Sequence, residues 1–245
     1  MKNTIAILIL SIFFILNGCE NKQTVLPNED ADSNSNKGSL SLHIHSKIGK
    51  EDIKTLDSAY FMASGDTIWV KSARIYISNI RLLKSDGTET KVDGSPILIE
   101  QYNKVYNTGR VIAGNYRAVA FEIGFSYKEE NSKKFITSPS MLIGEEAIFV
   151  NFEGLWYQKS KQRKLPFQLN IGADLPLCTF KSNSQSITIL PQNNFYVHLN
   201  IDYFQLLSEL NTEDSASLTI SKQSDHPVLY KELMNKIKVM VKNED

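Results

Sequence analysis

The strongest constraint on the fold is a series of short apolar–polar alternations that recurs along most of the chain. Leu40, Leu42 and Ile44 alternate with polar residues, and residues 195–203 repeat the pattern. Successive side chains of a strand point to opposite faces of a sheet, so this spacing predicts strands with one buried face. Turn-forming pairs such as Asp86 and Gly87 separate the segments. The chain is therefore expected to form many short strands.

The expected elements occupy the region from Gly38 to the C-terminus. Strands are expected at residues 40–45, 67–71, 74–84, 97–100, 103–112, 116–125, 147–158, 167–171, 179–180, 186–190 and 195–203. Helical patterns are confined to Phe204–Leu210 and Val228–Val239. Many strands and few helices predict an all-β fold, an antiparallel β-sandwich with one or two short helices near the C-terminus. Residues 38–245 are long enough for one such domain.

The first residues predict export and lipid attachment. Lys2 precedes the apolar run Ile5–Leu16, which is shorter than the roughly 20 residues that a membrane-spanning helix needs. The run has the length of a signal-peptide core, and Gly18 stands directly before Cys19. This order resembles the lipobox of bacterial lipoproteins. We expect residues 1–18 to be a lipoprotein signal peptide and Cys19 to carry the lipid; the alternative is an ordinary cleaved signal followed by a chance cysteine.

The segment after Cys19 predicts a tether rather than folded structure. Residues 19–37 are rich in Asn, Asp, Glu and Ser, with almost no apolar residues after Leu26. Such a composition buries too little surface to order itself, so a disordered tether is expected. The mature protein would then be a cell-envelope lipoprotein, held at a membrane, expected to be the outer one, by the lipid on Cys19. Its domain would face the periplasm or the cell surface.

Charge, cysteine content and motifs exclude several classes of function. Lysine and arginine total 27, as do aspartate and glutamate, so no basic excess indicates a nucleic-acid partner. Of the two cysteines, Cys178 has no partner once Cys19 is acylated, so no disulfide framework is expected. The sequence contains no nucleophile elbow, phosphate loop, dinucleotide fingerprint or His-Glu-x-x-His motif. The chain is therefore not expected to be an enzyme.

The four histidines are the most informative polar residues. His43 and His45 are two residues apart in an expected strand, so their side chains share a face. An imidazole pair of this kind suits copper or zinc. His198 lies on the polar face of its own strand, and if the two strands are neighbours, three imidazoles converge; the fourth histidine is His226. The alternative is that each histidine is simply a polar residue on the solvent side of its strand.

Several longer segments match the pattern of one family. They are Leu42–His45, Arg74–Leu82, Ala113–Tyr116, Val119–Gly124, Ser138–Met141, Phe149–Gly154, Phe167–Gly172 and Val197–Tyr203. Together they resemble the MbnP-like family of copper-binding periplasmic proteins, in particular the lipoprotein branch found in Bacteroidetes. The resemblance implies copper as the cofactor and a periplasmic or outer-membrane protein partner. The family is associated with a di-haem peroxidase.

The sequence departs from this family at two positions that bear on copper. Family members known for copper binding combine histidines with a tryptophan, oxidised to kynurenine, shortly after the methionine that aligns with Met141. Here residues 142–146 contain no aromatic residue, and Asn170 replaces the family's histidine. Asparagine is a poor copper ligand beside imidazole. The kynurenine-type site, and with it the peroxidase partnership, is therefore not expected.

Two functions remain as hypotheses. The first is a metal-binding lipoprotein that holds or ferries copper through His43, His45 and His198, with binding that weakens below about pH 6.5 because the ligand nitrogens must be deprotonated. The second is a non-catalytic scaffold or protein-interaction lipoprotein that has lost the family's metal site. In that case Trp156 and Tyr157, followed by the basic run Lys159–Lys164, form a contact loop; the alternative for the run is a solvated hairpin tip.

Overall fold

The computed structural model describes residues 35–94, 96–100, 104–125, 135–136, 138, 141–143, 146–172, 178–182, 186–207, 216–220 and 227–243. The expected signal peptide, Cys19, nearly all of the expected tether and His226 lie outside these residues. Within the described part of the chain, no helix combines the length and apolar character needed to span a membrane.

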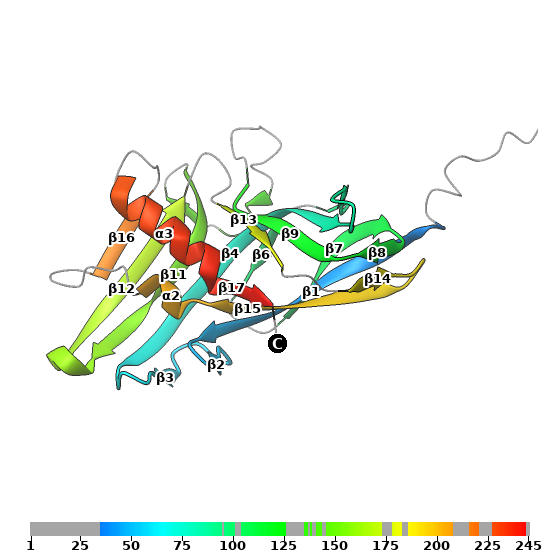
Figure 1. Cartoon of the computed structure of the whole chain (residues 1–245). Helices are drawn as coiled ribbons and strands as arrows, with labels where there is room; N and C mark the ends of the chain where they lie inside the picture. Colours follow the sequence, from blue (N-terminus) through cyan, green and yellow to red (C-terminus); the bar gives the residue numbers. More distant parts are fainter. Residues whose placement is uncertain are drawn as a thin grey trace, which may run out of the picture. The chain divides into compact units, whose positions relative to one another are not determined.

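The described elements are mostly strands (Figure 1). The strands are β1 (Lys37–Ile48), β2 (Glu51–Asp52), β3 (Ala59–Phe61), β4 (Thr67–Leu83), β5 (Glu89–Lys91), β6 (Ile97–Ile99), β7 (Lys104–Ile112), β8 (Gly114–Tyr116), β9 (Ala118–Ile123), β10 (Leu142–Ile143), β11 (Glu146–Gln158), β12 (Arg163–Gly172), β13 (Cys178–Lys181), β14 (Ile187–Ile189), β15 (Asn194–Asp202), β16 (Ala216–Ile220) and β17 (Val241–Asn243). The helices are the 3₁₀ turn η3 (Lys159–Lys161), α2 (Phe204–Leu207) and α3 (Pro227–Met240). The expected all-β class and the short helices near the C-terminus are confirmed.

Two main sheets form the domain. The smaller one has the order β17-β15-β1-β2, with β7 also paired to β1, and the larger one has the order β13-β9-β4-β11-β12-β16, with β3, β5, β6 and β10 at its margins. Strands β8 and β14 form a separate pair. Most pairings are antiparallel, as expected for a sandwich, but β1–β15 and β12–β16 are parallel. A parallel pair needs a long connection, and the chain between β1 and β15 contains most of the domain.

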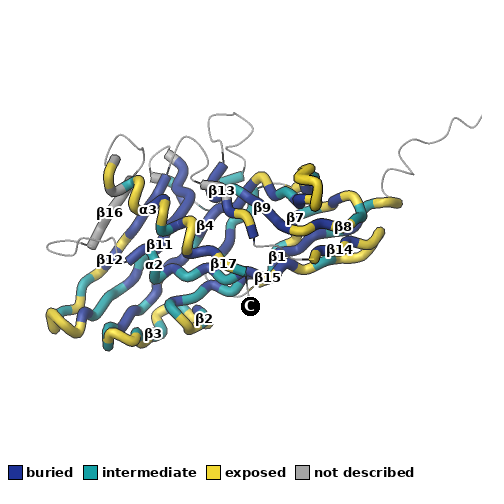
Figure 2. The backbone as a smooth tube through the Cα atoms, in the orientation of Figure 1, coloured by how far each residue is buried: buried dark blue, intermediate teal, exposed yellow. Residues whose placement is uncertain are grey.

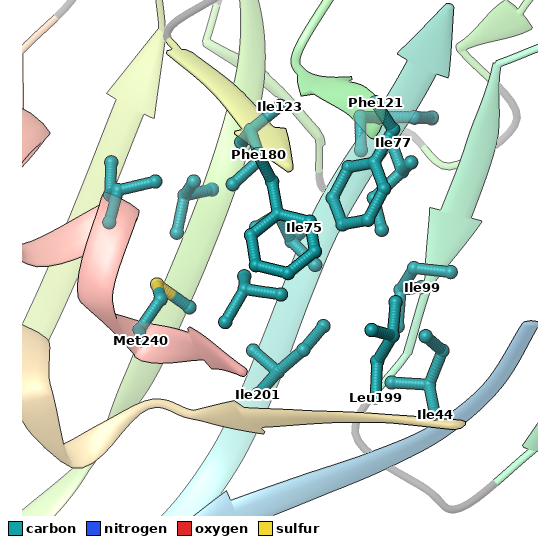
Figure 3. Close-up of a cluster of buried hydrophobic side chains, with 14 of the residues drawn as sticks. Ile44, Ile75, Ile77, Ile99, Phe121, Ile123, Phe180, Leu199, Ile201 and Met240 are labelled. Carbon is teal, nitrogen blue, oxygen red and sulfur yellow. The ribbon is translucent and has the colours of Figure 1, made fainter. Parts of the chain in front are cut away.

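The core lies between the inner faces of the two main sheets. Figure 3 shows side chains of the smaller sheet, such as Ile44 and Leu199, pointing toward Ile75 and Ile77 of β4. Met240 of α3 joins this cluster, and all five side chains are fully buried. Burying a side chain of this size contributes about 1.5–3 kcal/mol, so the inward faces of β1 and β15 are strongly fixed. The outward faces of β1 and β15 carry mostly polar residues.

Strand β4 is longer than the sequence predicted, because the two expected segments 67–71 and 74–84 join into one strand. A bulge shifts its register against β9 between Ser78 and Arg81. At the bulge Asn79 has a φ of 47°, a left-handed conformation that asparagine tolerates better than most residues. The Asn79 amide donates to Glu122 Oε1 at 2.7 Å, and the buried Ser78 hydroxyl donates to the Gly124 carbonyl. The bulge therefore lies within Arg74–Leu82, one of the segments on which the family resemblance rests.

Candidate metal centre

The parallel register of β1 and β15 places the predicted histidines beside one another. His43 pairs with His198, and His45 pairs with Asn200. Leu42 and Ile44, on either side of His43, are fully buried, so the histidines of β1 occupy the opposite, outward face of the sheet. Much of the backbone of β1 is buried (Figure 2). His43 and His45 are half-buried, whereas His198 is exposed. The alternation that predicted the strands therefore also sets the direction of the imidazoles.

The three imidazoles form a close cluster. The Nδ1 atoms of His43 and His198 are 3.1 Å apart. The ring centroid of His43 lies 4.5 Å from that of His45 and 4.7 Å from that of His198. One nitrogen from each ring lies within 4.8 Å of the other two. The predicted convergence of His43, His45 and His198 is thus confirmed, while metal binding itself stays a prediction.

These separations fit one metal ion after a small adjustment of the rings. Two metal–nitrogen bonds of about 2.0–2.1 Å hold their nitrogens about 2.9 Å apart at a right angle and about 3.4 Å apart at a tetrahedral angle. The 3.1 Å between the Nδ1 atoms of His43 and His198 lies between these values. The 4.8 Å limit for the whole group exceeds the maximum of about 4.2 Å for two ligands of one ion, so two nitrogens at that limit must approach by about 0.6 Å to take opposite positions and by about 1.4 Å to take a tetrahedral angle.

The same short separation depends on the tautomers of the two rings. A nitrogen pair at 3.1 Å forms a hydrogen bond only when one ring donates N–H and the other accepts with a bare nitrogen. A bare ring nitrogen is also the atom with which an imidazole binds a metal.

A carboxylate supports the cluster from strand β2. Asp52 Oδ2 lies 3.6 Å from His45 Nδ1, and Asp52 Oδ1 lies 3.8 Å from Lys47 Nζ. Metal-binding histidines usually direct their second ring nitrogen to such a group, which fixes the orientation of the ring. The turn before β2 is tied to β15, because the Gly49 N–H donates to Asp202 Oδ1 at 2.8 Å. Sequence reasoning missed Asp52, because nothing in the sequence indicates that β2 folds back onto β1.

Buried tyrosines near the same sheet add no charge to the site. Burial raises the pKa of the Tyr203 hydroxyl well above its ordinary range, and burial also raises the pKa of Tyr106 on β7. Both phenols are therefore neutral at physiological pH. The charged groups described around the site include Asp52 and Lys47 beside His45, and the exposed Lys242, which pairs with Asn200 on the neighbouring strand β17.

Asn170, where the family resemblance would place a histidine, lies in a different part of the fold. Asn170 lines a pocket of about 300 Å³ on the larger sheet, together with Leu142, which follows the buried Met141. The Asn151 amide donates to Asn170 Oδ1 at 2.8 Å, and the Ser72 hydroxyl donates to Asn151 Oδ1. All three polar side chains are buried. The described lining of this pocket also includes the charged residues Lys71, Arg74 and Glu153 and contains no imidazole.

The basic run of the alternative hypothesis forms the tip of the β11–β12 hairpin. Lys159–Lys161 make the 3₁₀ turn η3, and Gln162 closes it with a φ of 49°. Residues 159–162 are exposed, as a solvated tip would be. The neighbouring aromatic residues are engaged within the fold: the Trp156 Nε1–H donates to Asp66 Oδ2 at 3.3 Å, and Lys164 Nζ lies 4.0 Å from the ring centre of Trp69. The structure thus provides no separate support for a contact loop here.

Comparisons with known proteins agree with the fold. The family model described as MbnP matches residues 37–224. Among solved structures, MbnP from Methylosinus trichosporium superimposes with a TM-score of 0.50 over 76% of this chain and 81% of that chain, at 12% sequence identity. At this level of identity the likeness establishes a shared fold. No curated protein matches the sequence closely enough to count as a relative.

Proposed function

The chain belongs to the MbnP family, and we propose that it is a metal-binding protein that holds copper through His43, His45 and His198. The observation that carries this proposal is the convergence of three imidazoles on one outward sheet face, with Nδ1 atoms of two of them 3.1 Å apart. Scattered surface histidines have no reason to meet in this way. The family resemblance favours copper, as does the high affinity of nitrogen ligands for Cu²⁺ among divalent ions of the first transition row.

The exposure of the cluster suits a protein that takes up and passes on its ion. His198 is exposed, so an incoming ligand from a partner can reach the ion beside it. His43 and His45 are half-buried and Asp52 lies near His45, so the rings on β1 are held in place more firmly than the ring of His198. We propose a periplasmic or outer-membrane protein as the exchange partner. The expected lipid on Cys19 would keep the domain in the cell envelope.

A copper titration against a competing chelator tests this function. The full chain is expected to bind one copper ion, and the His43→Ala/His45→Ala double variant is expected to bind it at least about 100-fold more weakly, because two of three ligands are lost. His226→Ala is the matched control, since it removes a histidine outside the proposed cluster. It is expected to bind like the wild type.

The contrary result is equally clear. Equal binding by the wild type and the double variant, at micromolar dissociation constants or weaker, would exclude this site. The scaffold hypothesis would then be the remaining one.

A further inference from the structure

The three histidines occupy three corners of a four-residue square on the outer face of β1 and β15. The register places His43 opposite His198 and His45 opposite Asn200, so Asn200 is the fourth corner. We propose that the side-chain oxygen of Asn200 is the fourth ligand of the ion, which is then held by three nitrogens and one oxygen. This inference rests on the proposed copper function and adds a ligand to the same site.

The first support is the state of the Asn200 oxygen. Asn200 Oδ1 is buried, and no hydrogen-bond partner for it exists in the described structure. A buried carbonyl oxygen without a partner is costly and uncommon, and an ion is one of the groups that account for it. Asn243 Oδ1 is also without a partner, but Asn243 pairs with the inward-facing Leu199 and so lies on the other face of the sheet.

The second support is the reach of the side chains. Neighbouring strands lie about 4.8 Å apart and alternate residues of one strand lie about 6.6 Å apart, so four such side chains surround a small area. The rings of His43 and His45 lean together across the longer edge, with centroids 4.5 Å apart. An asparagine Oδ1 is two bonds from Cβ, as is a histidine Nδ1. Asn200 can therefore extend its donor as far above the sheet as the Nδ1 atoms of His43 and His198 extend theirs.

The added oxygen predicts a preference between oxidation states of copper. Four nitrogen and oxygen donors arranged around a square are typical of Cu(II), whereas Cu(I) favours softer ligands. An asparagine oxygen binds copper more weakly than imidazole does, so Asn200 is expected to add to Cu(II) binding as a fourth donor beside three imidazoles and to contribute little to Cu(I) binding. The amide is neutral, so it does so without changing the charge of the site.

The test compares Asn200→Leu, which removes the oxygen and keeps the volume, with Asn194→Leu. Asn194 lies on the same strand and face, where its Oδ1 accepts from the Ser41 hydroxyl at 3.1 Å. In the full chain, Asn200→Leu is expected to weaken Cu(II) binding about tenfold or more and to alter the Cu(II) electron paramagnetic resonance spectrum, with Cu(I) affinity changed less than about threefold. Asn194→Leu is expected to leave both affinities and the spectrum unchanged.

Asn200→Asp keeps an oxygen donor at the same place. It therefore distinguishes the loss of a ligand in Asn200→Leu from a general effect of substitution at this position. It is expected to bind Cu(II) at least as tightly as the wild type. A wild-type spectrum and affinity in Asn200→Leu, or an equal loss in Asn200→Leu and Asn200→Asp, would overturn the role of Asn200 while leaving the three-histidine site intact. A wild-type chain that binds no copper would overturn the proposed function itself.

Discussion

At the scale of single residues, the candidate site depends on where a few side chains stand in two strands. The spacing of His43 and His45 indicated a shared face, and the structure places both imidazoles there. Asn200 follows His198 by two residues, so its place on the same face was also readable from the sequence. The lack of a hydrogen-bond partner for its side-chain oxygen could not be predicted from the sequence, because hydrogen bonding depends on which groups the fold brings near.

Asp52 provides a test at this scale. If Asp52 orients His45, then Asp52→Asn should weaken copper binding about 10- to 100-fold, as is typical for the loss of a carboxylate next to a metal-binding histidine. Copper affinity is measured by competition. Nitrogen NMR of the His45 ring in the copper-free protein is expected to show a changed tautomer population.

Lys47→Met is the control for that variant, because it removes a cationic neighbour of Asp52 and leaves the carboxylate in place. It should change copper affinity by less than about threefold, as expected for the loss of a partly exposed ion pair. If Asp52→Asn binds copper as tightly as the wild type and keeps the same tautomer, Asp52 does not position His45.

At the scale of elements, alternation predicted the strands and failed to predict their partners. Strands β1 and β15 were both expected, because apolar residues line one face of each. Their parallel pairing joins residues more than 150 positions apart in the sequence, and alternation carries no information about which strands meet. Strand β16 was missed, and β4 was expected as two pieces, because the small residues Ser72 and Ala73 interrupt its apolar pattern.

The bulge in β4 gives a prediction for an element. Asn79 has a positive φ, so Asn79→Gly should change the free energy of unfolding by less than about 1 kcal/mol, since glycine adopts this conformation freely and its gain offsets the lost bond to Glu122. Asn79→Val should lower the stability by about 2 kcal/mol or more, because a β-branched side chain is strained there. Chemical denaturation of both variants measures the difference. Equal losses would show that the side-chain bond, rather than the backbone conformation, decides the stability.

At the scale of the whole molecule, the fold separates two regions that the sequence could not tell apart. The histidine cluster lies on the outer face of the sheet formed by β1 and β15, whereas Asn170 lines a pocket on the sheet formed by β4, β11 and β12. Family membership alone does not say which region holds an ion. The chemistry of the side chains favours the first region, because imidazoles gather only there within the described residues.

The position of the copper ion is therefore the most direct test of the account. Crystals of the copper-loaded protein, measured on both sides of the copper absorption edge, give an anomalous difference map that locates the metal without assumptions about its ligands. The account predicts one strong peak within bonding distance of His43, His45 and His198. A peak in the Asn170 pocket instead, or no ordered peak at the histidines in fully loaded crystals, would contradict it.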